Sequence, residues 1–254
     1  MCRRQVVILG VLLFIGVVSL AYSSLALADL KTFDSTVTDI WDTTLVLSPD
    51  PAISLKIPDH DLKDCLLDAQ TVIERRLDKL SLTGTYQVAV EDGQLEVSLS
   101  KNENLPYLAN IVTTIGQIEF IDGGTASPPL GRRIKVGPQA DPAHDIYQAL
   151  FTGDDVENII PPDPAAGQIF YSLVLKPAAV TQFDRFIQTN SNSNPYVCVV
   201  VDERVVNCST MYHWSHNTLE ILPNLSGGTM IGISDLVVFT ESGILPVPLK
   251  IVAD

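Results

Sequence analysis

A single apolar segment of bilayer-spanning length opens this chain of 254 residues, and no other apolar run of that length follows it. The basic sequence Met1-Cys2-Arg3-Arg4 precedes the segment, and the residues from Val6 to Ala28 carry no charged side chain. A polytopic membrane protein is therefore excluded. About 225 residues remain, which is enough for one large domain or two small domains with hydrophobic cores.

Two interpretations of the N-terminal segment, residues 1–28, remain open. As a single-pass transmembrane anchor, it would keep its N-terminus in the cytoplasm through Arg3 and Arg4. As a signal peptide, it would be cleaved after Ala28, because Ala26-Leu27-Ala28 is an A-x-A site. Both interpretations place residues 29–254 on the extracytoplasmic side, either attached to the cell membrane or secreted.

The chain is acidic, with 30 aspartate and glutamate residues against 16 lysine and arginine residues, and a net charge of -14. An excess of carboxylates repels phosphate groups. Nucleic acid and anionic lipid surfaces are therefore excluded as favoured partners.

The apolar spacing between residues 43 and 121 predicts an ordered series of elements. A strand at 43–47 precedes a helix that Asp61 would cap and that runs to Leu80. Asp92-Gly93 is a strong signal for a hairpin, Pro106 suits the first turn of a second helix, and residues 117–121 read as a strand. The order β-α-β-β-α-β is that of a ferredoxin-like fold.

The second half approximates the same order of elements. Residues 122–145 read as a connector rich in glycine and proline, and residues 145–150 as weakly helical. The predicted elements that follow are a strand at 168–175, a helix from Pro177, a hairpin over 196–208, strands at 218–222 and 229–233, a helix at 235–242 and an edge strand at 244–252.

The predicted fold class is therefore α+β, with two ferredoxin-like (βαββαβ) halves after the N-terminal segment. Each half would form an antiparallel sheet covered on one face by helices, with residues 122–145 outside both sheets. The helical spacing predicts these buried residues: Leu66, Val72, Ile73, Leu77, Val112, Phe183 and Phe186.

Two of the four cysteines lie symmetrically in the predicted hairpin. Cys198 and Cys208 are equidistant from Glu203, so a three-residue turn, Asp202-Glu203-Arg204, would place them opposite each other and favour a disulfide in an oxidising compartment. A two-residue turn would put them out of line. Cys2 is expected to stay reduced, and Cys65 to be a small buried hydrophobic residue.

Candidate catalytic and metal-binding patterns are weak. His213 and His216 are three residues apart without further zinc ligands, and they read as part of a surface loop. Gly227-Gly228 has no nearby basic residue that would favour phosphate binding. No metalloprotease, nucleophile-elbow or nucleotide-binding motif is present. The sequence thus predicts a protein that is not an enzyme and needs no cofactor or metal.

The C-terminal run Gly243-Ile244-Leu245-Pro246-Val247-Pro248-Leu249 resembles the end of the first large periplasmic domain of the SecD protein-export family. Gly227 and Gly228, followed by Ile231-Gly232, resemble the glycine signature of that family ahead of a short helix. The segments 72–77, 118–120 and 150–156 also resemble the family. The resemblance covers about residues 60–254, and the family motif residues Gly227, Gly228, Gly243, Pro246 and Pro248 are expected to be structural.

The resemblance implies a division of the chain into subdomains. A ferredoxin-like base subdomain would span residues 41–123, a connector 124–150, and a SecD head-like subdomain 151–254, with a C-terminal return to the base. The five later membrane helices of SecD are absent from this sequence, and the aspartate-leucine-glycine-glycine motif expected after the first helix is also not found. The resemblance therefore concerns the exoplasmic domain and not a proton-coupled motor.

Two hypotheses about function follow from the resemblance. In the first, the extracytoplasmic domain binds exported or unfolded polypeptide as an accessory to Sec-type translocation, with Sec translocon membrane subunits as further partners. In the second, it is a stand-alone extracytoplasmic scaffold with no Sec role. Neighbouring genes for Sec subunits would favour the first.

Overall fold

The computed structural model describes residues 43–54, 57–80, 82, 84–100, 104–190, 192–210, 212–223 and 231–252. The predicted anchor or signal segment, residues 1–28, lies outside this part of the chain. Within the described residues, no helix has both the length and the apolarity required for a membrane crossing.

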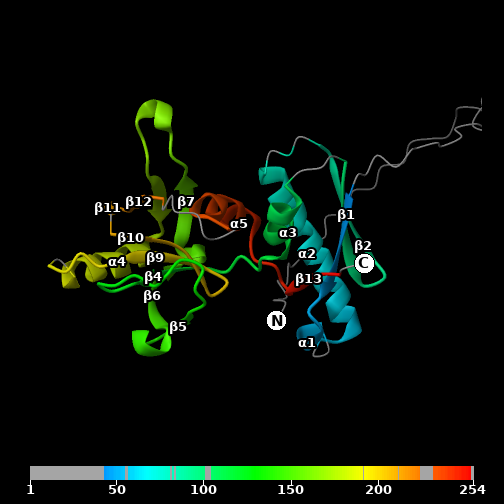
Figure 1. The fold of residues 1–254 in the computed structure, drawn as a ribbon, viewed down its shortest axis with the longest axis horizontal. Helices are drawn as coiled ribbons and strands as arrows, with labels where there is room; N and C mark the ends of the chain where they lie inside the picture. Colours follow the sequence, from blue (N-terminus) through cyan, green and yellow to red (C-terminus); the bar gives the residue numbers. More distant parts are fainter. Residues whose placement is uncertain are drawn as a thin grey trace, which may run out of the picture.

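The chain forms two lobes that lie side by side along the long axis of the molecule (Figure 1). The base lobe comprises residues 43–115 and 245–252, and the head lobe comprises residues 116–244. The strands of the base lobe are β1 (Thr43–Pro49), β2 (Tyr86–Glu91), β3 (Gln94–Leu99) and β13 (Leu249–Ile251), and its helices are α1 (Pro51–Ser54), α2 (Asp59–Lys79) and α3 (Leu105–Thr113).

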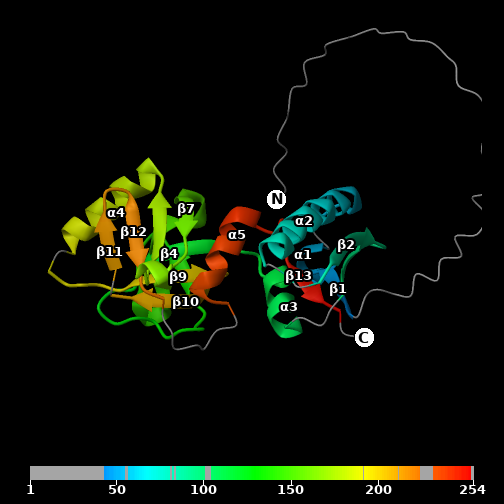
Figure 2. The same cartoon turned by 90° about the horizontal axis from the view of Figure 1, so that it is seen from above.

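The base lobe is an antiparallel sheet with the strand order β13-β1-β3-β2. Alternate residues of β1 and β3 are buried, because successive side chains of a strand point to opposite faces of the sheet. The long helix α2 and the shorter α3 pack against this buried face, as Figure 2 shows from above. Asp92-Gly93 forms the tip of the β2–β3 hairpin, as predicted.

The head lobe contains two further sheets. One has the order β10-β9-β4-β6-β5 and the other β11-β12-β8-β7. Their strands are β4 (Ile118–Asp122), β5 (Lys135–Gly137), β6 (Ile146–Thr152), β7 (Val156–Ile160), β8 (Tyr171–Leu175), β9 (Val197–Val201), β10 (Arg204–Ser209), β11 (Tyr212–Ser215) and β12 (Thr218–Ile221). Helix α4 (Pro177–Thr189) packs on the head, and helix α5 (Leu236–Ser242) lies on the side that faces the base (Figure 1).

The α+β class is confirmed, but the arrangement of sheets differs from the prediction. The described residues form three sheets rather than two. Strand β4, which was predicted to complete the first sheet, instead lies at the centre of the sheet β10-β9-β4-β6-β5, between β9 and β6. We call this five-stranded sheet the head sheet. The C-terminal strand β13 takes its place at the edge of the base sheet, so the edge predicted for the second half belongs to the base lobe. Sequence spacing could not distinguish these pairings, because both are long-range.

The prediction that residues 122–145 lie outside the sheets is wrong. Strand β5 falls within this range and pairs in parallel with β6, and β6 begins at Ile146, where a weak helix was predicted. Leu130, Ile134 and Val136 cover the second face of the head sheet, where they pack against Cys198 and Val200. Strand β9 is therefore buried on both faces, which explains its uninterrupted apolar sequence.

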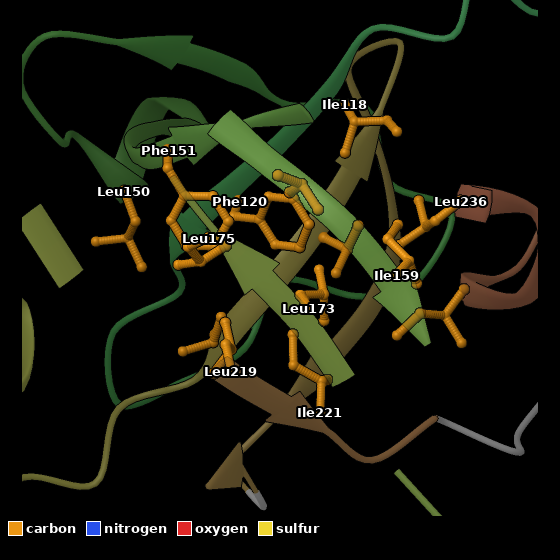
Figure 3. Packing of buried hydrophobic residues seen from close by; sticks show 14 of the residues in the cluster. Ile118, Phe120, Leu150, Phe151, Ile159, Leu173, Leu175, Leu219, Ile221 and Leu236 are labelled. Carbon is orange, nitrogen blue, oxygen red and sulfur yellow. The ribbon is translucent and has the colours of Figure 1, made fainter. Parts of the chain in front are cut away.

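The seven residues predicted to be core positions are all buried, with relative exposures of 9% or less. The largest cluster lies in the head lobe, between its two sheets and helices α4 and α5. Figure 3 shows how side chains from β4, β6, β7, β8 and β12 meet there, with Phe120 and Phe151 stacked at 4.3 Å between ring centroids.

The hairpin of β9 and β10 contains a disulfide between Cys198 and Cys208. Its turn has two residues, Asp202 and Glu203, both with positive φ, rather than the three that were predicted. A bulge between Val205 and Asn207 shifts the register by one residue and brings Cys208 directly opposite Cys198. The bulge thus offsets the shorter turn.

Cys65 is buried in α2, as predicted, with 2% of its surface exposed. Cys65 is also disulfide-bonded, which the sequence analysis did not predict. Its partner lies outside the described residues, as does Cys2.

Removal of the Cys198–Cys208 disulfide is expected to lower the free energy of unfolding by about 2.7 kcal/mol, the loop-entropy value for a loop of about ten residues. The comparison is between urea unfolding curves of the oxidised chain and of the Cys198→Ala/Cys208→Ala variant. Mass spectrometry of the unreduced wild-type protein serves as the control. Two alkylatable thiols at these positions would contradict the disulfide itself.

Candidate functional site

Three of the predicted family motif residues, Gly243, Pro246 and Pro248, lie where the chain passes from the head lobe to the base lobe. Gly243 ends α5 with a φ of 90°, a conformation that favours glycine. Pro246 and Pro248 alternate with the buried residues Leu245, Val247 and Leu249, which enter the base core. Gly227 and Gly228 lie outside the described residues.

A buried arginine lies at the junction between the two lobes. Arg76 in α2 has 0% relative exposure, and its side chain is 4.9 Å from the ring centroid of Phe239 in α5. Its guanidinium donates hydrogen bonds to the carbonyl oxygens of Ile111 (2.8 Å), Thr114, Ile115 (2.9 Å) and Gly243 (3.1 Å), and to the hydroxyl of Ser242 (3.3 Å). One side chain of the base lobe thus binds both chain segments that connect the lobes.

The first of these connecting segments is also held from the head side. Asp202, in the β9–β10 turn, accepts hydrogen bonds from the backbone amides of Ile115 (2.6 Å), Gly116 (3.0 Å) and Gln117 (2.9 Å). Gly116 has a φ of 89°, and a Cβ atom there would lie 2.7 Å from the Arg76 guanidinium, so this position requires glycine.

The electrostatics of the junction favour a charged Arg76 at neutral pH. Burial lowers the pKa of Arg76 to about 10, and the Asp202 carboxylate opposes this effect. The guanidinium therefore remains protonated at pH 7, and its hydrogen bonds to carbonyl groups are charge-assisted.

Two further contacts join the lobes. The hydroxyl of Tyr107 in α3 donates a hydrogen bond to the buried Asp235 at 2.7 Å, and burial, reinforced by Asp235, raises the pKa of Tyr107. On the surface, Lys79 in α2 forms an ion pair with Glu241 in α5. These contacts fix the orientation of the head lobe relative to the base.

The head lobe has a groove of about 460 Å³ between α4 and β6, which we call the α4 groove. Its lining is rich in uncharged polar side chains and also includes one acidic residue, Asp122, and one basic residue, Arg185. The main uncharged polar residues of the lining are Gln148, Thr181, Gln182, Thr189 and Asn190. Leu150 and Phe186 supply apolar surface. Such a lining can hydrogen-bond amide groups of a ligand without requiring a particular charge.

Of the two histidines predicted to lie in a surface loop, His216 lies in an exposed turn, whereas His213 belongs to a strand. His213 belongs to β11 and faces Glu220 of β12, with 3.4 Å between Nδ1 and Oε2. His216 lies in the hairpin turn with a φ of 58°, and its Nδ1 is 2.9 Å from the Ser215 hydroxyl. Among the described residues, no three histidine, cysteine, aspartate or glutamate side chains are grouped to hold a metal ion.

Sequence reasoning did not identify Arg76 as a functional residue, although a signal was present. Arg76 follows Ile73 by three residues and precedes Leu77, so it occupies an apolar position of α2. An arginine in such a stripe needs buried acceptors, because a buried charge without partners is strongly unfavourable. The sequence did not show where those acceptors come from.

The geometry defines a two-lobed α+β protein in which the head lobe is inserted in the chain between α3 and β13 of the base lobe. No family model and no curated protein matches this sequence. A solved structure of SecDF, described as a membrane component that enhances protein export, shares the fold. It matches with 18% identity and a TM-score of 0.50, over 84% of this chain and 99% of that chain.

A second solved structure, SecDF in a form described as super-membrane-facing, matches with 19% identity and a TM-score of 0.54. The match covers 83% of this chain but only 29% of that much longer chain. The resemblance to SecD that the sequence indicated is therefore confirmed at the level of the fold.

Proposed function

We propose that the extracytoplasmic part of this chain binds exported or unfolded polypeptide as an accessory to Sec-type protein translocation. The observation that carries the proposal is the fold shared with a SecDF chain that is matched over 99% of its length. The α4 groove supports the proposal, because neutral hydrogen-bonding side chains can bind the main chain of many different polypeptides.

The chain would act on the extracytoplasmic side of the cell membrane, without a nucleotide, a metal or a bond-making step. Its partners would be translocating polypeptide and Sec membrane subunits. We also propose that the base lobe is ferredoxin-like, since two β-α-β connections and the order β13-β1-β3-β2 support that description.

The test is a titration of the full chain, in detergent micelles, with a fluorescently labelled secretory protein that is unfolded by reduction and alkylation. We expect weak saturable binding, because ordering a flexible chain costs conformational entropy. The net charge of -14 favours basic or apolar clients, and this preference should fade as salt screens it. The same secretory protein in its folded state is the control.

Variants in the α4 groove localise the binding. Gln148→Ala together with Gln182→Ala should raise the Kd on the order of tenfold, because two side-chain amides are lost. Gln188→Ala removes an exposed amide of α4 outside the groove lining and should leave the Kd unchanged. If the unfolded protein does not bind at low or moderate salt, and a specific folded partner is found, the stand-alone scaffold replaces the proposal.

A further inference from the structure

Strand β7 is an edge strand of the sheet β11-β12-β8-β7, and among the described strands it pairs only with β8. The backbone amide of Leu175 donates a hydrogen bond to the carbonyl oxygen of Asn217 at 2.8 Å, across the β8–β12 ladder. Leu173 lies two residues earlier in β8, so its backbone N–H and C=O also point toward β12. Ile159 lies opposite Leu173. The N–H and C=O of Ile159 therefore point away from β8, toward the free edge.

A groove of about 300 Å³ runs along this edge, which we call the β7 groove. The strand residues 156–159 form one wall, and Val237, Thr240 and Glu241 of α5 form the other. Figure 1 shows α5 beside β7, on the side of the head lobe that faces the base. An extended chain in this groove would meet backbone hydrogen-bonding groups on the strand side and helix side chains on the other.

The hydroxyl of Thr240 in this groove is unusual. Its Oγ1 is buried and makes no hydrogen bond to any described group. Buried polar atoms almost always have a partner, so an unpaired hydroxyl in a groove lining calls for an explanation. If the Thr240 side chain rotates toward the groove, a main-chain group of a bound polypeptide would supply the missing hydrogen bond.

The charges around the β7 groove are negative. Glu157 and Glu241 are both exposed lining residues, and Lys79, the ion-pair partner of Glu241, lies in the base lobe. Ile160 follows directly in β7 and is 42% exposed. The groove thus presents carboxylates next to apolar surface, which complements a polypeptide that carries both lysine or arginine and apolar residues.

We infer that β7 binds an extended polypeptide stretch of basic and apolar residues by strand addition, with the main chain on Ile159 and Thr240 and a basic side chain at Glu157. This inference rests on the proposed function and specifies its substrate class at a second surface, apart from the α4 groove. Free strand edges are open to such pairing because their amides and carbonyls lack partners.

The first test uses ten-residue unfolded peptides that alternate apolar residues with either lysine or glutamate, titrated against the full chain at low salt. The lysine peptide is expected to bind at least tenfold more tightly than the glutamate peptide. Glu157→Lys should abolish this difference. Glu91→Lys is the matched control, because Glu91 is an exposed glutamate on β2, an edge strand of the base sheet, and it should leave the difference unchanged.

The second test uses Thr240→Val, which replaces the hydroxyl by a methyl group of similar shape. It should raise the Tm of the free protein by roughly 2–4 °C, because an unpaired buried hydroxyl is removed. It should also weaken binding of the lysine peptide several-fold. Gain in stability and loss of binding in one variant is a combination that damage to the fold does not produce.

The outcomes separate the inference from the function on which it rests. If unfolded protein binds, and the α4 groove variants weaken that binding while Glu157→Lys and Thr240→Val do not, the β7 site is overturned and the proposed function stands. If no unfolded polypeptide binds to the wild-type chain, both are overturned. Equal affinity for the lysine and glutamate peptides contradicts the substrate class inferred here.

Discussion

Replacement of Arg76 by methionine is expected to lower the free energy of unfolding by about 3–5 kcal/mol. Methionine retains much of the side-chain volume but cannot donate hydrogen bonds. The carbonyls of Ile111, Thr114 and Gly243 would then lose the donor that Arg76 supplies at the junction, and Asp202 would lose its nearby cation. Urea unfolding followed by circular dichroism measures the loss.

Two variants show whether the loss comes from the hydrogen bonds. Arg76→Lys keeps the positive charge but not the planar fork, so it should lie between the wild type and the methionine variant. Arg75→Met removes an exposed neighbour in α2 and should change the stability by less than about 0.5 kcal/mol. Equal stabilities of Arg76→Met and Arg75→Met would show that the buried network does not hold the lobes together.

Phe183→Ala is expected to cost about 3–5 kcal/mol through the cavity it leaves in the head lobe. Phe183 has 0% relative exposure, and its ring lies 4.9 Å from Trp214, 5.4 Å from Phe186 and 5.8 Å from Phe151, measured between centroids. Near-ultraviolet circular dichroism should weaken as the aromatic packing loosens, and urea unfolding gives the free energy.

The matched control for this prediction is again Gln188→Ala, on the exposed surface of the same helix α4. It should change the free energy of unfolding by less than about 0.5 kcal/mol. A small effect of Phe183→Ala, similar to that of the control, would mean that the head core collapses to fill the space. The aromatic cluster would then not determine the stability of the head lobe.

Local features of the fold could be predicted from the sequence with good accuracy. The Asp92-Gly93 turn, helices α2, α3 and α4 and their buried faces follow from spacing and turn chemistry within short windows. The pairing of β4 with β9, and of β1 with β13, joins residues that are far apart in the chain. The ferredoxin-like order of elements predicted the base sheet for β4, and this assignment was wrong.

The junction between the two lobes was harder to predict, because its residues come from both lobes. The glycines and prolines at 122–145 correctly indicate broken secondary structure, but they do not indicate that Ile134 is buried against the head sheet. The alignment of Cys198 with Cys208 depends on a bulge in β10 that no sequence pattern predicts. Arg76 and Asp202 meet the same chain segment from opposite sides only after both lobes have folded.

The insertion of the head lobe into the base sheet sets the order in which the protein can be completed during synthesis. Strand β1 leaves the ribosome well before its partner β13, since Leu47 pairs with Ile251. One edge of β1 therefore stays open until β13 emerges. A head lobe that folds first would help β13 to reach β1 once β13 has been synthesised, because the two boundaries of the head lobe lie close together. The amide nitrogen of Leu245 is 2.9 Å from the carbonyl oxygen of Ile115. The folded head lobe thus acts as a closed loop that places β13 next to β1. Chains that stop short of residue 249 would keep an unpaired, aggregation-prone edge on β1.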